Sequence, residues 1–150
     1  MSEAKQPTTK MEQSMTRPII EHIVNKAKEK LTIVATDEPC TAGMNHLYVV
    51  SGFNAQTNPS RQHVEDCPSS AEKIEILFQN GPVLDLVPNG VTNEALLAVV
   101  VDRLRCIQAG LGASPAYGVA LTKLEDALDC LKHRTILMDR FQVRGVPLSS

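Results

Sequence analysis

The sequence predicts an α+β protein: a small antiparallel β-rich N-terminal part followed by a C-terminal antiparallel αα-hairpin. Short β-branched runs, bounded by Asn, Gly and Pro, occupy the first 90 residues. Two longer stretches, with apolar residues at alternating spacings of three and four, occupy the rest. Only a few residues separate these two stretches, and so short a connection makes neighbouring helices antiparallel.

The composition restricts the class of protein. A chain of 150 residues allows one domain with an appendage. A net charge of −2 argues against binding a polynucleotide through bulk positive charge, and 3% aromatic residues with no Trp weaken a base-stacking platform. The longest apolar run, Ala95–Val101, is too short to span a membrane, and Met1–Lys10 has no apolar signal-peptide core. We therefore expect a cytoplasmic protein with no membrane or polynucleotide partner.

Three segments are expected: a disordered tail over 1–16, a β-rich part with one short helix over 17–90, and a helical hairpin over 91–146. The tail is polar and has no periodicity. Pro18 can occupy the first turn of a helix. Apolar residues follow it at helical spacing, which predicts a short amphipathic helix to about Lys30: Ile19, Ile20, Ile23, Val24 and Ala27.

The strands of the first part are predicted at Leu31–Thr36, Asn45–Gly52 and Lys73–Gln79, where β-branched or alternating apolar residues occur. Residues 53–70 are polar and predict a long loop. Asn80-Gly81 predicts a type I′ hairpin turn, with a return strand over Val83–Val87.

The two helices have clear start and stop signals. Thr92 or Asn93 can cap the first helix, and Gly110 ends it. Ser114 followed by Pro115 can start the second. Apolar positions of the first helix recur at Leu97, Val100, Leu104, Ile107 and Leu111; those of the second at Tyr117, Leu121, Leu124, Leu128, Leu131, Thr135 and Met138. The first helix is also apolar at Leu96, Val99 and Val101, so a sheet, a second subunit or both must cover it.

Motifs for catalysis or metal binding are scarce. The sequence has no phosphate-binding loop, dinucleotide fingerprint, HExxH or GxSxG motif. Asp37 and His46 could join a Ser or Cys in a triad, but nothing in the sequence places them together. His63 with Cys67, and Cys130 with His133, each have the spacing of half a zinc site; zinc spacing normally comes as two such pairs, which favours surface His residues beside inert thiols. We expect no catalytic residue, no metal and no cofactor.

Basic residues gather at the C-terminal end, where Lys132 is followed by Arg134, Arg140 and Arg144. Two interpretations remain open. The arginines can complement the negative end of a helix dipole, or they can bind phosphate through the planar guanidinium fork. The balance of charges over 91–150 favours a small anionic ligand over a polynucleotide.

The runs FQNGPVLDLVPNGVTNEALLAVVVDRLRCIQAG and ALTKLEDALDCLKHRT, followed by RGV, resemble a phage family of nucleotide sponges. This is the Thoeris anti-defence family, which shares its helical hairpin with the anti-CBASS sponges. The resemblance covers roughly residues 74–146, with a weaker extension to MNHLYVV. It implies a homo-oligomer, often a hexamer built as a trimer of dimers. It also implies binding, without cleavage, of immune signalling nucleotides: cyclic ADP-ribose isomers or cyclic oligonucleotides.

This chain departs from the family pattern at the site that the resemblance implies. Where the family has Gly-Phe-Gln, this chain has Cys-Ile-Gln ending in Gln108, so Ile107 replaces a stacking ring by an apolar contact. Tyr117 replaces an Asn and can either stack on a base or belong to the hairpin seam. Arg134 matches a family arginine, and Arg140 can substitute for a second one.

The predicted function is therefore sequestration of a cyclic or ADP-ribose-derived immune signalling nucleotide in the infected bacterial host. Two alternatives remain: an enzyme that degrades such a nucleotide, and a phage interaction protein that reuses the hairpin only to oligomerise. We expect phosphate contacts from Arg134, Arg140 and Arg144, a base site lined by Ile107 and Tyr117, and polar contacts from Gln108 and Lys123.

Overall fold

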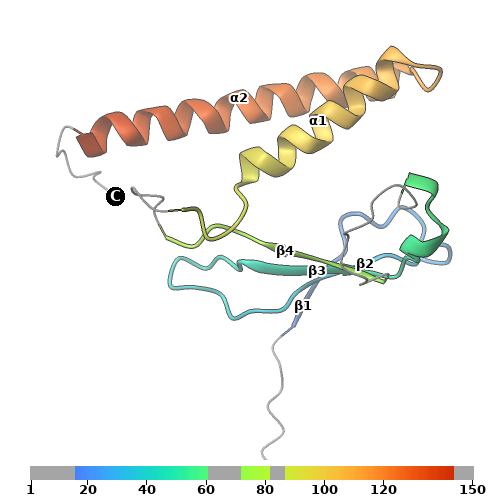
Figure 1. The fold of residues 1–150 in the computed structure, drawn as a ribbon, viewed down its shortest axis with the longest axis horizontal. Coiled ribbons are helices and arrows are strands. Elements are labelled where there is room, and N and C mark those ends of the chain that lie inside the picture. The colour runs from blue at the N-terminus through green and yellow to red at the C-terminus, as the bar shows by residue number, and fades with distance from the viewer. Residues whose placement is uncertain (1–15, 61–71, 82–86, 144–150) are drawn as a thin grey trace, which may run out of the picture. The chain divides into compact units, whose positions relative to one another are not determined.

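The computed structural model describes residues 16–60, 72–81 and 87–143, with side chains to Arg140 (Figure 1). The chain forms two compact units, residues 1–80 and residues 81–150. The first holds a β-sheet and the second a pair of helices, so the predicted α+β class is confirmed.

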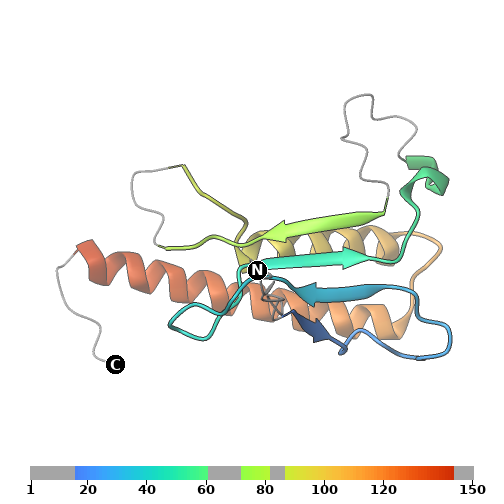
Figure 2. The same ribbon diagram turned by 90° about the horizontal axis from the view of Figure 1, so that it is seen from below.

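The first unit is a four-stranded antiparallel sheet in the order β1-β2-β3-β4 (Figure 2). Its strands are β1 (Arg17–Ile19), β2 (Thr32–Ala35), β3 (Leu47–Ser51) and β4 (Lys73–Leu77). The last three lie within the strands predicted from β-branched and alternating residues. A short 3₁₀ helix, η1 (Ala55–Thr57), begins after the cap residue Asn54, inside the predicted long loop.

Little of this sheet is buried within the described part of the chain. Its fully buried hydrophobic residue is Ala35, and Tyr48 packs edge to face against Phe78 with ring centroids 5.5 Å apart. Ile74 and Leu77 of β4 are each about half exposed, at 54% and 51%. The alternating apolar residues of β4 therefore predict a strand, but they do not show that one face of the strand is buried.

The predicted helix over 18–30 is wrong. Residues 17–19 form β1, the edge strand, which pairs with β2 from Arg17–Ala35 to Ile19–Ile33. An edge strand tolerates Pro18, which has no N–H to donate. Beyond it, the Asn25 side chain accepts a hydrogen bond from the Ala27 N–H (3.0 Å), a local turn that competes with a helix. Val24, an expected member of the buried stripe, is 97% exposed.

The turn after β4 also differs from the prediction. A type I′ turn needs positive φ at both central residues, but among the described residues only three glycines have positive φ, one of them Gly81 at +83°. Asn80 is not among them, so the type I′ assignment is wrong. The predicted return strand, Val83–Val87, falls mostly outside the described residues.

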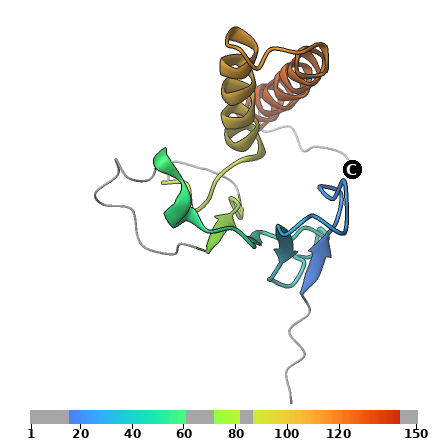
Figure 3. The ribbon, with the colours of Figure 1, turned by 90° about the vertical axis from the view of Figure 1, so that its right-hand side faces the viewer.

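The second unit is a hairpin of α1 (Asn93–Ala109) and α2 (Pro115–Val143), which lie side by side and are joined by a short loop (Figure 3). The Thr92 hydroxyl caps α1 by accepting a hydrogen bond from the Ala95 N–H (3.2 Å). The Ser114 hydroxyl does the same for the Tyr117 N–H (3.2 Å) at the start of α2. Both predicted helices and both cap residues are confirmed.

Candidate functional site

One buried hydrophobic residue on each helix marks the line along which α1 and α2 pack against each other. Val101 of α1 is 2% exposed and Leu128 of α2 is 8% exposed, and these are the buried hydrophobic residues of the described hairpin. The sequence pattern had grouped Val101 with the extra apolar surface, but its neighbours Val100 and Val99 are the more exposed pair, at 44% and 68%. The seam therefore runs through Val101.

Two polar contacts between the helices fix which flanks of α1 and α2 share a face. Arg105 of α1 donates through Nε to Glu125 Oε1 of α2 (2.8 Å). Thr135 Oγ1 lies 3.2 Å from Glu94 Oε1, near the first turn of α1. An α-helix turns about 100° per residue. The angle of each remaining exposed residue from the buried residue of its helix therefore assigns it to one of two hairpin faces.

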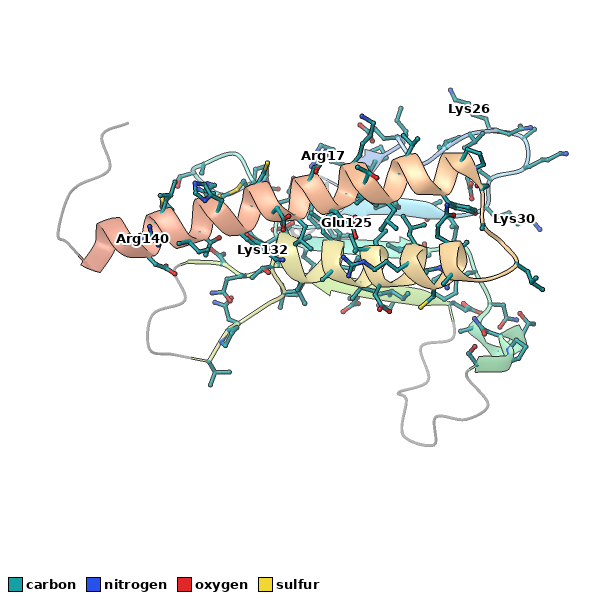
Figure 4. All side chains as sticks on the ribbon, turned by 90° about the horizontal axis from the view of Figure 1, so that it is seen from above. Arg17, Lys26, Lys30, Glu125, Lys132 and Arg140 are labelled. Atoms are coloured by element: carbon teal, nitrogen blue, oxygen red, sulfur yellow. The ribbon has the colours of Figure 1, made fainter. Side chains whose placement is uncertain are left out.

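The two faces differ in chemistry. One, here the charged face, carries ionised side chains from both helices: Asp102, Arg105, Glu125, Asp129 and Lys132. The other, here the apolar face, carries Leu96, Val100, Leu104 and Ile107 of α1 and Ala120, Ala127 and Leu131 of α2. Figure 4 labels Glu125 and Lys132 of the charged face.

The two predicted phosphate-binding arginines fall on different faces. Arg134 and Arg140 are both exposed, about 9 Å apart along α2 and about 120° to either side of the buried Leu128 line. Arg134 borders the apolar face, and Arg140 borders the charged face on the part of α2 that extends past the start of α1 (Figure 4). Lys123, also exposed, lies three turns before Arg134 on the same flank. Arg144 lies outside the described residues.

Arg134 has an acidic neighbour that the sequence pattern did not single out. The Glu94 backbone N–H, then the Thr135 and Thr92 hydroxyls and the charge of Arg134, lower the pKa of the Glu94 carboxyl against the opposing effect of its partial burial. The Glu94 carboxylate contacts Thr135, 41 residues later, so no local spacing could have predicted this contact; it depends on the register of the two helices.

At the tip of the hairpin (residues 107–118), Gln108 is committed to the loop. Its Nε2 donates to the Ser114 carbonyl and its Oε1 accepts from the Ser114 N–H, both at 3.1 Å. A Cβ at Gly118 would lie 3.1 Å from Gln108 Nε2, so the bare backbone there lets α2 approach this amide. The predicted role of Gln108 as a ligand contact thus competes with two existing hydrogen bonds.

Ile107 and Tyr117 lie near the tip as well. Ile107 is half-buried, and a Cβ at Gly112 would come within 3.1 Å of its Cγ2, so the loop passes closely over it. Tyr117 lies on the seam side of α2 and is 42% exposed. From Tyr117 to Arg134 the helix rises about 25 Å, which separates the tip from the basic end within one chain.

The sheet brings together one other pair noted in the sequence. His46 Nδ1 lies 3.8 Å from Asp37 Oδ2, and that carboxylate also accepts hydrogen bonds from the backbone N–H groups of His46 (2.6 Å) and Leu47 (3.1 Å). The His46 N–H is the largest cause of the lowered pKa of Asp37. Asn45, buried at 8%, donates to the Asp37 carbonyl (2.6 Å) and accepts from Arg17 (2.9 Å). These contacts tie a loop to the sheet.

Metal ligands do not gather in the described part of the chain: no three His, Cys, Asp or Glu side chains there could hold one ion together. Cys130 is exposed on α2, three residues before the exposed His133, whereas His63 and Cys67 fall outside the described residues. Within the same described part, no helix is both long and apolar enough to cross a membrane.

The fold and the hairpin define a small α+β protein with a two-helix domain of unlike faces. Residues 70–129 match the family model described as Acb2/Tad1, hairpin domain. The chain is 41% identical, over 68 residues, to a protein of Bacillus phage SBSphiJ7 named Thoeris anti-defense 1. The resemblance stated from the sequence is therefore confirmed over residues 70–129, which are similar to the Acb2/Tad1 hairpin domain.

Both matches cover only part of the chain. The alignment to the phage protein covers 45% of this chain and 48% of that protein, so the chain spans about half the length of the curated relative it matches. The family match includes Ile107, Gln108, Tyr117 and Lys123 but ends at residue 129, before the last arginines of α2.

Proposed function

We propose that this protein acts against bacterial anti-phage defence by sequestering a signalling nucleotide, a cyclic oligonucleotide or a cyclic ADP-ribose isomer, without cleaving it. The observation that carries the proposal is the Acb2/Tad1 hairpin with an apolar face bordered by Lys123 and Arg134. Apolar surface suits the flat face of a base, and an arginine suits a phosphate through paired N–H donors. Binding would take place in the cytoplasm of the infected host.

The length of the hairpin supports a site built from more than one copy. Tyr117 and Arg134 are about 25 Å apart along α2, too far for both to contact one small cyclic nucleotide from a single chain. A two-fold arrangement of hairpins brings the tip of one copy to the basic end of another. We therefore propose a homo-oligomer, with a hexamer built as a trimer of dimers as the assembly that the family resemblance implies.

Exposed apolar residues supply a surface for such an assembly. Several are more than one third exposed on the described hairpin: Val91, Val99, Val100, Leu111, Val119, Ile136 and Leu137. Apolar side chains in this number are what contact between copies would cover.

Light scattering at micromolar concentration tests the assembly. Val100→Asp, on the apolar face, should give a smaller particle, whereas Ala98→Asp, two residues away on the charged side, should keep the wild-type mass. A wild-type monomer would contradict the proposed oligomer.

Ligand recovery tests sequestration against degradation. The protein is mixed with a panel of cyclic dinucleotides, cyclic trinucleotides and cyclic ADP-ribose isomers and examined by native mass spectrometry. The bound nucleotide is then released by heat and weighed by mass. A sponge returns it intact, and an enzyme returns a product. If no nucleotide in the panel binds, the proposal fails and the interaction-protein alternative gains support.

A further inference from the structure

We propose that Glu94 is an internal anion that competes with ligand phosphate for Arg134 and so sets the affinity of that site. This inference rests on the proposed function insofar as Arg134 binds phosphate. It adds a residue on the other helix, and it predicts that removing an acidic side chain improves binding.

Glu94 is in the first turn of α1, where unpaired backbone N–H groups and the helix dipole favour a negative charge. Its Oε1 lies 3.2 Å from the Thr135 hydroxyl of α2, which also lies 3.2 Å from the Leu131 carbonyl oxygen. The carboxylate is therefore held at Thr135 of α2, the residue that follows Arg134 in the sequence.

Glu94 is half-buried and Arg134 is exposed, and the positive charge of Arg134 is one of the causes that keep the Glu94 carboxyl ionised. No ion pair within 4 Å joins the two among the described residues, so the carboxylate does not hold the Arg134 guanidinium in a salt bridge. An incoming phosphate meets both charges: attraction from Arg134 and repulsion from Glu94.

Glu125 provides a matched control within the hairpin. Glu125 is likewise half-buried and ionisable, but it pairs with Arg105 and lies about 14 Å along α2 from Arg134. Glu94→Gln and Glu125→Gln change the net charge by the same amount. Only the first removes a charge beside Arg134, and Gln at position 94 keeps an oxygen for Thr135 and a good helix former in α1.

The experiment titrates inorganic pyrophosphate into the full chain and follows the Arg134 Nε–H signal by ¹⁵N NMR, assigned with Arg134→Lys. Glu94→Gln should bind pyrophosphate about two- to fivefold more tightly than wild type, the range for one partly exposed charge pair. Glu125→Gln should bind as wild type does. Added salt should shrink the gain, because it screens exposed charges. Circular dichroism establishes that both variants keep the helical content of wild type.

Two results would overturn the inference. If Glu94→Gln binds no more tightly than Glu125→Gln, or more weakly than wild type, the carboxylate orients Arg134 and does not compete with the ligand. If the Arg134 signal responds in neither protein, Arg134 is not an anion site and Glu94 controls no affinity there. The proposed function fails on a different measurement, when no signalling nucleotide binds in native mass spectrometry.

Discussion

At the tip of the hairpin, the Gln108 amide makes two hydrogen bonds with the backbone of Ser114, whereas at the open end, where α2 passes the start of α1, Arg134 and Arg140 are exposed. Both ends carry residues that the sequence assigns to a ligand. At the tip, the polar atoms of the Gln108 side chain are already paired with the backbone. At the open end, cationic side chains point away from the seam. A polar residue near a site is thus structural or functional according to what already uses its hydrogen bonds.

The largest effect should come from the seam that joins the two ends. Val101→Asp buries a carboxylate beside Leu128 and should destabilise the hairpin by about 3 kcal/mol or more. Ala98→Asp, at an exposed position on the charged side of the same helix, should leave the helical circular dichroism and the unfolding midpoint near those of wild type. Equal losses in the two variants would mean that Val101 is not the seam residue.

At the open end, Arg134→Ala should weaken nucleotide binding by about 1.5–3 kcal/mol, the scale of a hydrogen bond to a charged group, without changing thermal stability. We expect a loss of the same order from Arg140→Ala. Because the two residues border different faces, their losses should add in the double variant, as for separate contacts. Calorimetry on the three variants checks this. Strong coupling would place both arginines on one phosphate.

At the tip, the opposite pattern is expected. Gln108→Ala removes both hydrogen bonds to Ser114 and should lower the free energy of unfolding by about 1–2 kcal/mol. Nucleotide affinity should fall only slightly, because the change reduces the order of the loop and removes no ligand contact. Urea unfolding and calorimetry on the same preparation separate the two. A tenfold loss of affinity with unchanged stability would return Gln108 to the ligand site.

Tyr117 tests whether the tip takes part in ligand choice. The ring of Tyr117 is 42% exposed and offers a stacking surface, whereas the family Asn offers an amide that donates and accepts in one plane. Tyr117→Asn should shift the ratio of affinities toward cyclic ADP-ribose isomers over cyclic oligonucleotides by about 1–2 kcal/mol. An unchanged ratio would leave Tyr117 as a seam residue.

The smallest effect concerns acid stability, in which the two units can be compared. The pKa values of Asp37 in the sheet and Glu94 in the hairpin lie below their ordinary values of 3.8 and 4.5. The stabilisation by the ionised forms is therefore present above those ordinary values and is lost as pH falls through the lowered ones. Asp37→Asn and Glu94→Gln should each flatten the fall in unfolding free energy between about pH 5 and pH 3. If either variant keeps the wild-type dependence of unfolding free energy on pH, the carboxyl that it lacks does not stabilise the fold in this range.

The sequence located the elements whose signals are local. Thr92, Gly110 and the Ser114-Pro115 pair bound the two helices because caps and stops act within one turn. The strands over 32–35, 47–51 and 73–77 followed from β-branched and alternating residues. The same local reasoning failed at 18–30, where pairing with β2 and the turn at Asn25 outweighed a helical spacing of apolar residues.

The candidate site was only partly predictable for the same physical reason. A sequence shows that residues 134 and 140 are arginines on one helix, but it does not show where the buried line of that helix runs. The register of α1 against α2 decides that line through Val101 and Leu128, and it assigns the two arginines to different flanks. It also brings the Glu94 carboxylate to the Thr135 hydroxyl.

By itself, then, the sequence determined the helices, most of the strands and the resemblance to the Acb2/Tad1 hairpin domain, since capping, periodicity and motif spacing are properties of neighbouring residues. Only the tertiary structure decided which apolar residue is buried, which charges meet and which polar groups are already paired. The contacts between the helices join residues 20 and 41 positions apart, Arg105 with Glu125 and Glu94 with Thr135. The free energy of such contacts comes from packing two helices in one register, and no local stretch of sequence contains that information.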